Sequence, residues 1–201
     1  MTSEFAIYFR LGVGHIADLK GYDHILFIVA LTAGYGIGDW RRLLWLVTAF
    51  TVGHSLTLAL ATLRLVRVHA PTIELLIAVT IVATAVYSAV SALAIRQREA
   101  RAPGPHVFLY GMAGIFGLIH GLGFSNFLRA VLGGEESIVV PLLAFNLGLE
   151  IGQLAIVAVV LAVGALACDV AGLSRRRWVT ALSAGIALVG ARMIYERLSG
   201  S

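Results

Sequence analysis

Apolar runs long enough to cross a bilayer recur along the whole chain, and this pattern leaves little choice of fold. A helix needs about 20 mostly apolar residues to cross the hydrocarbon core, and the backbone polar groups inside that core must be satisfied within the protein. The sequence therefore predicts an all-α, polytopic integral membrane helix bundle with about six transmembrane helices, forming a single transmembrane domain over residues 1–201. The predicted spans are 22–37, 41–63, 72–95, 106–132, 138–167 and 178–196, and a short interfacial helix is predicted at 4–14.

The charged residues are few and lie between the apolar runs. They make up 13% of the chain, against about 25% in a soluble domain, so too little polar sequence is left for a soluble domain. The net charge of +4 does not indicate a nucleic-acid partner, because the basic residues form short clusters typical of loops that face anionic lipid. Three arginine-dense loops favour the cytoplasmic side, which predicts that both termini lie outside. Their arginines are Arg41, Arg42, Arg96, Arg98, Arg101, Arg175, Arg176 and Arg177.

Four glycines lie near one face of the predicted span 106–132. Gly111, Gly114, Gly117 and Gly121 follow one another at spacings of three and four residues. Small residues on one face let a second helix approach closely. We expect this face to pack against another helix, and such packing would help to position polar side chains nearby.

The most informative residues are ionisable side chains within or beside the predicted spans. Each costs about 2.5–3.5 kcal/mol near the bilayer centre, and such residues are usually functional. Asp23 and His24 begin the first span, His54 lies in the second, His120 in the fourth and Glu150 in the fifth. One such residue alone would be explained by a hydrogen bond between helices. Together, on four helices, they favour a shared site.

The residue types in this set are those of a metal site without thiolates. Cys168 is the only cysteine, so a cysteine cluster is excluded. Imidazole and carboxylate groups suit divalent nickel, zinc, iron, copper, manganese or cobalt. We therefore predict a divalent transition-metal site within the membrane. The predicted ligands are Asp23, His24, His54, His120 and Glu150, with His15 as a further candidate that lies outside the first span.

Polar residues near these ligands are predicted to orient them. Asn146, Glu150 and Gln153 are spaced i, i+4, i+7, so they share one face of the fifth span. Thr51 and Ser55 stand near His54 in the second span. Groups that hydrogen-bond to metal ligands fix the ligands' orientation and their affinity for the ion.

Four motifs in this order resemble the HupE/UreJ family of bacterial membrane proteins. They are GYDHILF, FTVGHSLTL, FGLIHGLGF and FNLGLEIGQ, and the resemblance covers about residues 12–155. It implies a nickel permease in the bacterial inner (cytoplasmic) membrane, a multi-pass protein surrounded by the lipid bilayer. The family's functional positions fall on His15, Asp23, His24, His54, His120 and Glu150.

The resemblance also implies partners, and it includes one departure. The family is associated with hydrogenase and urease gene clusters, which makes nickel-enzyme maturation machinery a candidate partner. In better-known nickel permeases of the family, the first histidine is followed by proline and lies closer to the Asp-His pair. Here Ile16 follows His15, and seven residues separate His15 from Asp23.

The leading hypothesis is a secondary permease for a divalent transition metal, with nickel favoured. Ligands on several helices would form a site near the midplane that opens alternately to each side. The sequence contains neither a Walker A loop nor an HExxH motif. One alternative is a membrane-embedded mono- or dinuclear metalloenzyme that uses the same ligands. Another is a scaffold whose polar residues only hold the helices together.

Overall fold

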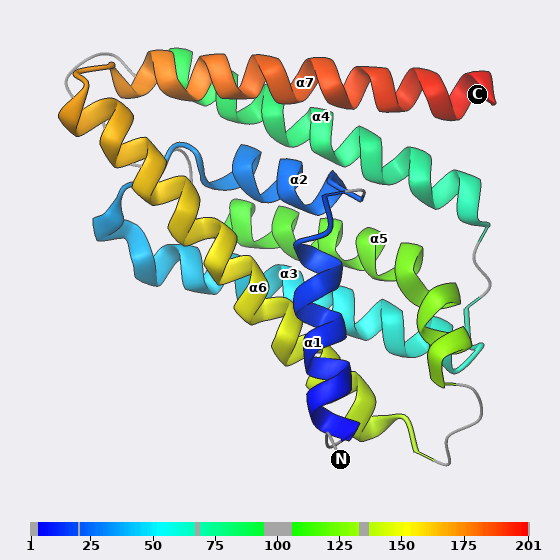
Figure 1. Ribbon diagram of the computed structural model, residues 1–201. Coiled ribbons are helices and arrows are strands. Elements are labelled where there is room, and N and C mark those ends of the chain that lie inside the picture. The colour runs from blue at the N-terminus through cyan, green and yellow to red at the C-terminus, as the bar shows by residue number, and fades with distance from the viewer. Residues whose placement is uncertain (1–3, 20, 67–68, 95–105, 133–136, 201) are drawn as a thin grey trace.

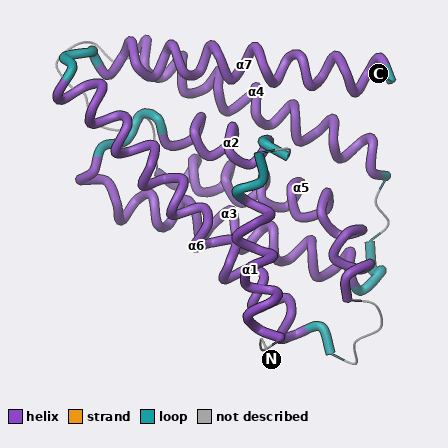
Figure 2. Tube along the Cα trace, viewed as in Figure 1, coloured by secondary structure: helices purple, strands orange, loops and turns teal. Residues whose placement is uncertain are grey.

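A computed structural model describes residues 4–19, 21–66, 69–94, 106–132 and 137–200. Within these ranges every regular element is helical, and no strand occurs (Figure 2). This confirms the predicted all-α fold class. The helices are α1 Glu4–Ile16, α2 Asp23–Thr32, α3 Trp40–Thr62, α4 Ala70–Ala94, α5 His106–Leu132, α6 Val139–Ala165 and α7 Arg175–Ser199. A 3-10 turn, η1 Ile37–Asp39, leads into α3, and a π turn, η2 Leu166–Val170, ends α6.

Five helical segments in the described part of the chain are long and apolar enough to cross a membrane. They are Ile37–Thr62, Ala70–Ala94, Leu109–Leu132, Val139–Val170 and Arg175–Ser199. These segments correspond to the second to sixth predicted spans. The predicted count of six is not confirmed, because the remaining apolar run forms only the ten-residue helix α2.

Helix α2 ends at Thr32, and the chain then forms a loop. Ten residues extend about 15 Å at 1.5 Å per residue, which is half of a typical hydrocarbon core. Gly36 then has an extended backbone with φ −110° and ψ 174°. The N–H of Gly36 donates a hydrogen bond of 3.1 Å to Oδ2 of Asp39. A loop therefore interrupts what reads in the sequence as one apolar run over 22–37.

Five of the seven described helices run along similar directions, and the other two cross them. In Figure 1, α2, α3, α4, α5 and α7 run in similar directions, whereas α6 crosses them obliquely and α1 stands at a steep angle to α7. The most extensive pairings are α3 with α5, α1 with α6 and α4 with α7. The predicted short helix at 4–14 is present as α1, whose buried residues Tyr8, Gly12 and Ile16 lie on one face.

The glycine face of α5 packs against α3, as the sequence predicts. A Cβ atom at Gly117 would overlap the carbonyl oxygen of Phe50, and one at Gly121 would overlap the carbonyl oxygen of His54. Gly111, at the start of the row, has open space around it. The close packing therefore lies at the level of His54, and it brings this part of α3 against α5.

A second close approach holds α1 against α6. A Cβ atom at Gly12 would overlap the carbonyl oxygen of Phe145, and one at Gly148 would overlap the carbonyl oxygen of Phe9. Helix α1 thus packs against the backbone of α6. Its last turn, which contains His15, lies beside the interior of the bundle.

The starts of α3 and α7 lie together at one end of the bundle, at the left of Figure 1. There Nη1 of Arg175 donates a hydrogen bond of 3.0 Å to the carbonyl oxygen of Tyr35, and Arg42 lies 3.2 Å from Asp39. Both arginines belong to loops predicted to be arginine-dense. Arg96, Arg98 and Arg101 of the remaining loop lie outside the described residues. The C-terminal end of α7 lies at the opposite end.

Candidate metal centre

Three histidines from three helices meet inside the bundle. One ring nitrogen from each of His15 on α1, His24 on α2 and His54 on α3 lies within 4.8 Å of the others. The ring centres of His15 and His24 are 4.7 Å apart, and that of His54 is 6.0 Å from His15 and 6.2 Å from His24. Among the described residues, we find no other such group of three or more His, Cys, Asp or Glu side chains. We call it the three-histidine group.

His120 on α5 lies beside this group. Its ring centre is 4.8 Å from that of His24, in an edge-to-face arrangement. His54 and His120 are 0% and 1% exposed, and His24 is 4% exposed. The fold therefore brings together all four histidines that the sequence singled out. His15, which the sequence placed outside the first span, is one of the three central residues.

The imidazole nitrogens of this region have few partners within the described protein. Five of them are buried without a hydrogen bond, namely Nε2 of His15, Nε2 of His24, both nitrogens of His54 and Nδ1 of His120. A buried polar atom without a partner costs about 1–3 kcal/mol, and such atoms are rare in native structures. Each neutral imidazole has one nitrogen with a free electron pair, and such nitrogens are suitable donors to a transition-metal ion.

Asp23 fixes the orientation of His24. Nδ1 of His24 lies 2.9 Å from Oδ1 of Asp23, which also accepts a 2.8 Å hydrogen bond from the His24 backbone N–H. An ionised carboxylate only accepts hydrogen bonds, so Nδ1 must carry the proton. Nε2 is then the nitrogen with a free electron pair. A carboxylate that accepts from the remote nitrogen of a histidine is the usual companion of a metal-binding imidazole.

Phenylalanine rings surround the histidines. The ring centre of Phe124 lies 3.8 Å from that of His15, and Phe50 lies 6.2 Å from His24 and 5.4 Å from His120. These rings offer no competing donor or acceptor to the nitrogens. The surroundings are apolar, so the electrostatic attraction between an ion and its ligands is stronger there than in water.

Glu150 lies outside the three-histidine group and pairs with a threonine instead. Oε1 of Glu150 on α6 accepts a 2.6 Å hydrogen bond from the hydroxyl of Thr48 on α3. One turn along both helices, Oε1 of Gln153 accepts a 2.8 Å hydrogen bond from Thr51. The two pairs form a polar seam between α3 and α6. The predicted polar face of α6 thus faces the helix that bears His54.

The remaining polar candidates lie around His54. Asn146 stands beside the His54 ring, and its amide donates a 2.8 Å bond to the carbonyl oxygen of Leu142. The hydroxyl of Ser55 donates a 2.6 Å bond to the carbonyl oxygen of Thr51 in its own helix. Asn146 is therefore the polar neighbour best placed to contact a ligand at His54.

Comparison with known families gives one match. A family model described as HupE / UreJ protein matches residues 1–197. The chain belongs to the HupE/UreJ family. Neither a curated protein nor a solved structure matches the chain. Membership implies an accessory role related to the transport of nickel or cobalt, in a family of membrane proteins, and the four clustered histidines agree with a connection to a transition metal.

Two threonines of this HupE/UreJ protein were missed by the sequence analysis. Thr48 holds Glu150, and Thr80 on α4 lies 3.3 Å from Nε2 of His120. A signal for Thr48 was present, because Thr48 and Thr51 have the same spacing of three as Glu150 and Gln153. No comparable pattern marked Thr80.

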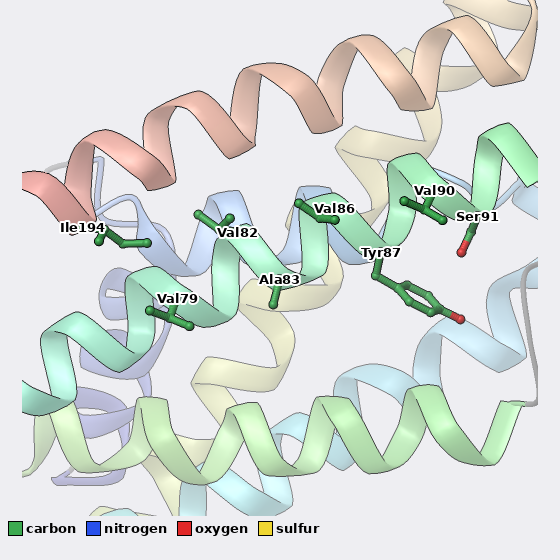
Figure 3. Close-up of a pocket in the computed structure, with 8 residues that line it drawn as sticks. All are labelled: Val79, Val82, Ala83, Val86, Tyr87, Val90, Ser91 and Ile194. Carbon is green, nitrogen blue, oxygen red and sulfur yellow. The ribbon is translucent and has the colours of Figure 1, made fainter.

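A groove on the HupE/UreJ bundle lies away from the histidines. It has a volume of about 550 Å³ and lies between α4 and α7, where Val79, Val86, Tyr87 and Ile194 line it (Figure 3). Val79 and Val86 are 43% and 50% exposed. The lining contains no histidine or carboxylate, so the groove is not a cation site.

Proposed function

We propose that this HupE/UreJ protein is a secondary permease for a divalent transition metal, with nickel as the favoured cargo. The proposal rests on one observation above all others. Buried imidazole nitrogens from four helices meet without hydrogen-bond partners in the described protein. If these residues only held helices together, their nitrogens would be expected to bond to one another or to the backbone.

We assign direct binding of the metal ion to the three-histidine group. Nε2 of His24 is the best-defined donor, because Asp23 holds the proton of that ring on Nδ1. Asp23 would then act by orienting His24 and by supplying negative charge. A divalent ion in an apolar interior requires such compensation, since burying an unpaired charge is strongly unfavourable.

Glu150 is proposed as the second carboxylate of the pathway. It lies one turn along α6 from Asn146, which stands beside His54. Thr48, Thr51, Asn146 and Gln153 would offer neutral oxygens along this seam. An ion that leaves the histidines would therefore meet a carboxylate before it meets apolar side chains.

The donor types limit the cargo. Imidazole nitrogen suits nickel, cobalt, zinc, copper and iron in the divalent state, whereas magnesium and calcium prefer oxygen ligands. Nickel is favoured because the family is connected with nickel and cobalt. The other metals are distinguished by the competition experiment described in the Discussion.

The interrupted N-terminal helices also support transport. His15 lies in the last turn of α1 and His24 in the first turn of α2, so the chain breaks beside the proposed site. Secondary transporters often build their substrate sites at such helix breaks near the midplane. Relative movement of these short helices would separate the ligands and release the ion.

The proposed location is the bacterial inner membrane. The end of the bundle that contains Arg42 and Arg175 would face the cytoplasm, and the C-terminal end of α7 would lie outside. Nickel delivered to the cytoplasm would then be available to nickel-enzyme maturation machinery, the proposed partner.

The test is uptake of nickel into liposomes that contain the purified protein. We expect the wild type and His69→Ala to transport nickel, because His69 is exposed and hydrogen-bonds to Thr72 away from the site. His24→Ala, His54→Ala and Glu150→Ala should lose most of the uptake while keeping the wild-type melting temperature.

Equal uptake in all variants would refute the permease. Tightly held stoichiometric zinc, iron or copper without uptake would instead identify a metalloenzyme, and loss of folding in the variants would identify a scaffold.

A further inference from the structure

His120 is held by a residue of α4 that has no assigned role. The hydroxyl of Thr80 lies 3.3 Å from Nε2 of His120, and it donates a 2.7 Å hydrogen bond to the carbonyl oxygen of Ile77. Both side chains are buried, with Thr80 5% exposed and His120 1% exposed. The contact is therefore shielded from competition by solvent.

This contact favours one tautomer of His120. A threonine hydroxyl has a single hydrogen, and that of Thr80 is used in the shorter bond to Ile77. Towards His120 the hydroxyl can only accept. Nε2 of His120 is then the favoured N–H donor, which leaves Nδ1 with a free electron pair.

Nδ1 is also the nitrogen of His120 without a partner. It is buried and makes no hydrogen bond within the described protein. The two nitrogens of an imidazole point in different directions, so Nδ1 faces away from Thr80. The His120 ring itself lies next to His24, whose Nε2 is likewise unpartnered.

We propose that Thr80 is a positioning residue that holds His120 as the Nε2–H tautomer, so that Nδ1 serves as a fourth nitrogen donor to the metal ion. The proposal builds on the proposed function, since it assigns a positioning residue to His120, one of the predicted ligands of the same cargo. His24 and His120 then use opposite nitrogens. Asp23 anchors Nδ1 of His24, and Thr80 anchors Nε2 of His120.

Loss of the Thr80 hydroxyl removes this constraint. Without an acceptor, an N–H at Nε2 would be buried and unpartnered, which is unfavourable. The ring can relieve this by rotating or by moving its proton to Nδ1. In either case the electron pair of Nδ1 is no longer held in position for the ion.

The first arm of the test needs no metal. The ¹⁵N chemical shifts of the His120 imidazole are measured by NMR in the metal-free full-length protein, with His120→Gln used for assignment. The proposal expects a protonated Nε2 and an unprotonated Nδ1 in the wild type and in Thr80→Ser. In Thr80→Val the pattern should change to a mixture or to the opposite tautomer. A wild type protonated at Nδ1 overturns the proposal, whether or not the protein transports metal.

The second arm measures binding of Co²⁺, whose visible absorption reports its ligands. Thr80→Val should weaken Co²⁺ binding about tenfold or more and shift its absorption, as loss of a group that orients a ligand does. Thr80→Ser keeps the hydroxyl and should restore both. Thr84→Val is the matched control, because Thr84 is also buried on α4 but its hydroxyl bonds only to the carbonyl oxygen of Thr80.

A double variant separates a positioning role from a general structural one. If Thr80 acts through His120, Thr80→Val should cause no further loss of Co²⁺ binding in the His120→Ala background. Additive losses, or wild-type binding and absorption in Thr80→Val, overturn the proposal. A wild type with the Nε2–H tautomer that binds no Co²⁺ overturns both the metal role of His120 and the proposed permease. A wild type that binds and transports metal while Thr80→Val is unchanged overturns the Thr80 proposal alone.

Discussion

The hydroxyl of Thr48 on α3 donates a 2.6 Å hydrogen bond to the carboxylate of Glu150 on α6. The two residues are 102 positions apart in the chain, and each is half-buried. The bond gives Glu150 a polar partner inside a bundle of apolar helices. It also links α3 to α6 at a position six residues before His54, which makes it a suitable first target for mutation.

Replacing Thr48 with valine should destabilise the protein. The carboxylate of Glu150 would lose its partner, and an unsatisfied partner of a charged hydrogen bond typically costs about 1–3 kcal/mol. The measurement is the free energy of unfolding or the melting temperature in detergent. Ser55→Ala is the control, since the Ser55 hydroxyl bonds only within its own helix. Equal melting temperatures for the wild type and Thr48→Val would contradict the importance of this bond.

Replacing Asp23 with alanine should weaken nickel binding about 10- to 100-fold, the range typical for loss of a group that orients a metal ligand. The reason is that Nδ1 of His24 would no longer be held as the proton donor. Calorimetric titration with Ni²⁺ measures the effect. Asp23→Asn should lose less, because its amide oxygen can still accept from Nδ1. Asp169→Ala, an exposed position, is expected to bind like the wild type, and an equal loss there would point to a general effect of charge.

Replacing Gly121 with alanine should force α5 away from α3. The new Cβ would overlap the carbonyl oxygen of His54, and overpacking of this kind typically costs about 1–3 kcal/mol. Nickel affinity should fall as well, since His54 and His120 would separate. Gly111→Ala on the same helix has open space, so its stability should be unchanged or slightly higher because alanine favours helix. Thermal melting and nickel titration of the two variants give the comparison, and matched results for both would show that the close contact is unimportant.

Competition among metals should follow the preferences of imidazole. We expect unlabelled Co²⁺, Zn²⁺ and Cu²⁺ to reduce uptake of ⁶³Ni²⁺ into liposomes when present at a similar concentration. Mg²⁺ and Ca²⁺ should have no effect even in about a thousandfold excess, because they prefer oxygen ligands. Strong inhibition by Mg²⁺ would indicate that carboxylates, rather than the histidines, form the selective site.

An ion pair far from the histidines provides a negative control for all of these variants. Glu74 at the start of α4 lies 2.6 Å from Arg197 near the end of α7, and both are more than 40% exposed. Glu74→Ala should change the free energy of unfolding by no more than about 1 kcal/mol. Nickel binding should be unaffected, and a large loss of binding would show that the site is coupled to the packing of α7.

Sequence patterns predicted the five long helices well because each is a sustained apolar run. The first predicted span, 22–37, is longer than the helix found there, because α2 ends at Thr32 and the glycine-containing residues 33–36 follow it. Beyond them, the bond from Gly36 to Asp39 turns the chain into α3. A measure of hydropathy contains no information about that bond.

The residues that form the candidate site could be predicted from the sequence, but the role of each residue could not. Ionisable residues inside apolar runs identified His24, His54 and His120, because such residues are costly in lipid, whereas His15 was a further candidate outside the first span. Whether Asp23 binds an ion or orients His24 depends on which atoms face each other, and spacing along the chain does not determine this. Thr80 was missed because a threonine in a membrane helix usually bonds to its own backbone, so its second contact becomes visible only in three dimensions.

The packing of α1 against α6 has a consequence for the order of synthesis. His15, His24 and His54 are synthesised within about forty residues of one another. The surface that holds α1 in place, around Phe145 and Gly148, is made about ninety residues later. The nascent chain therefore carries the central histidines long before it can hold them together. Under the proposed function, capture of metal would therefore wait until α6 has been made, and a product truncated before α6 would lack a stable site.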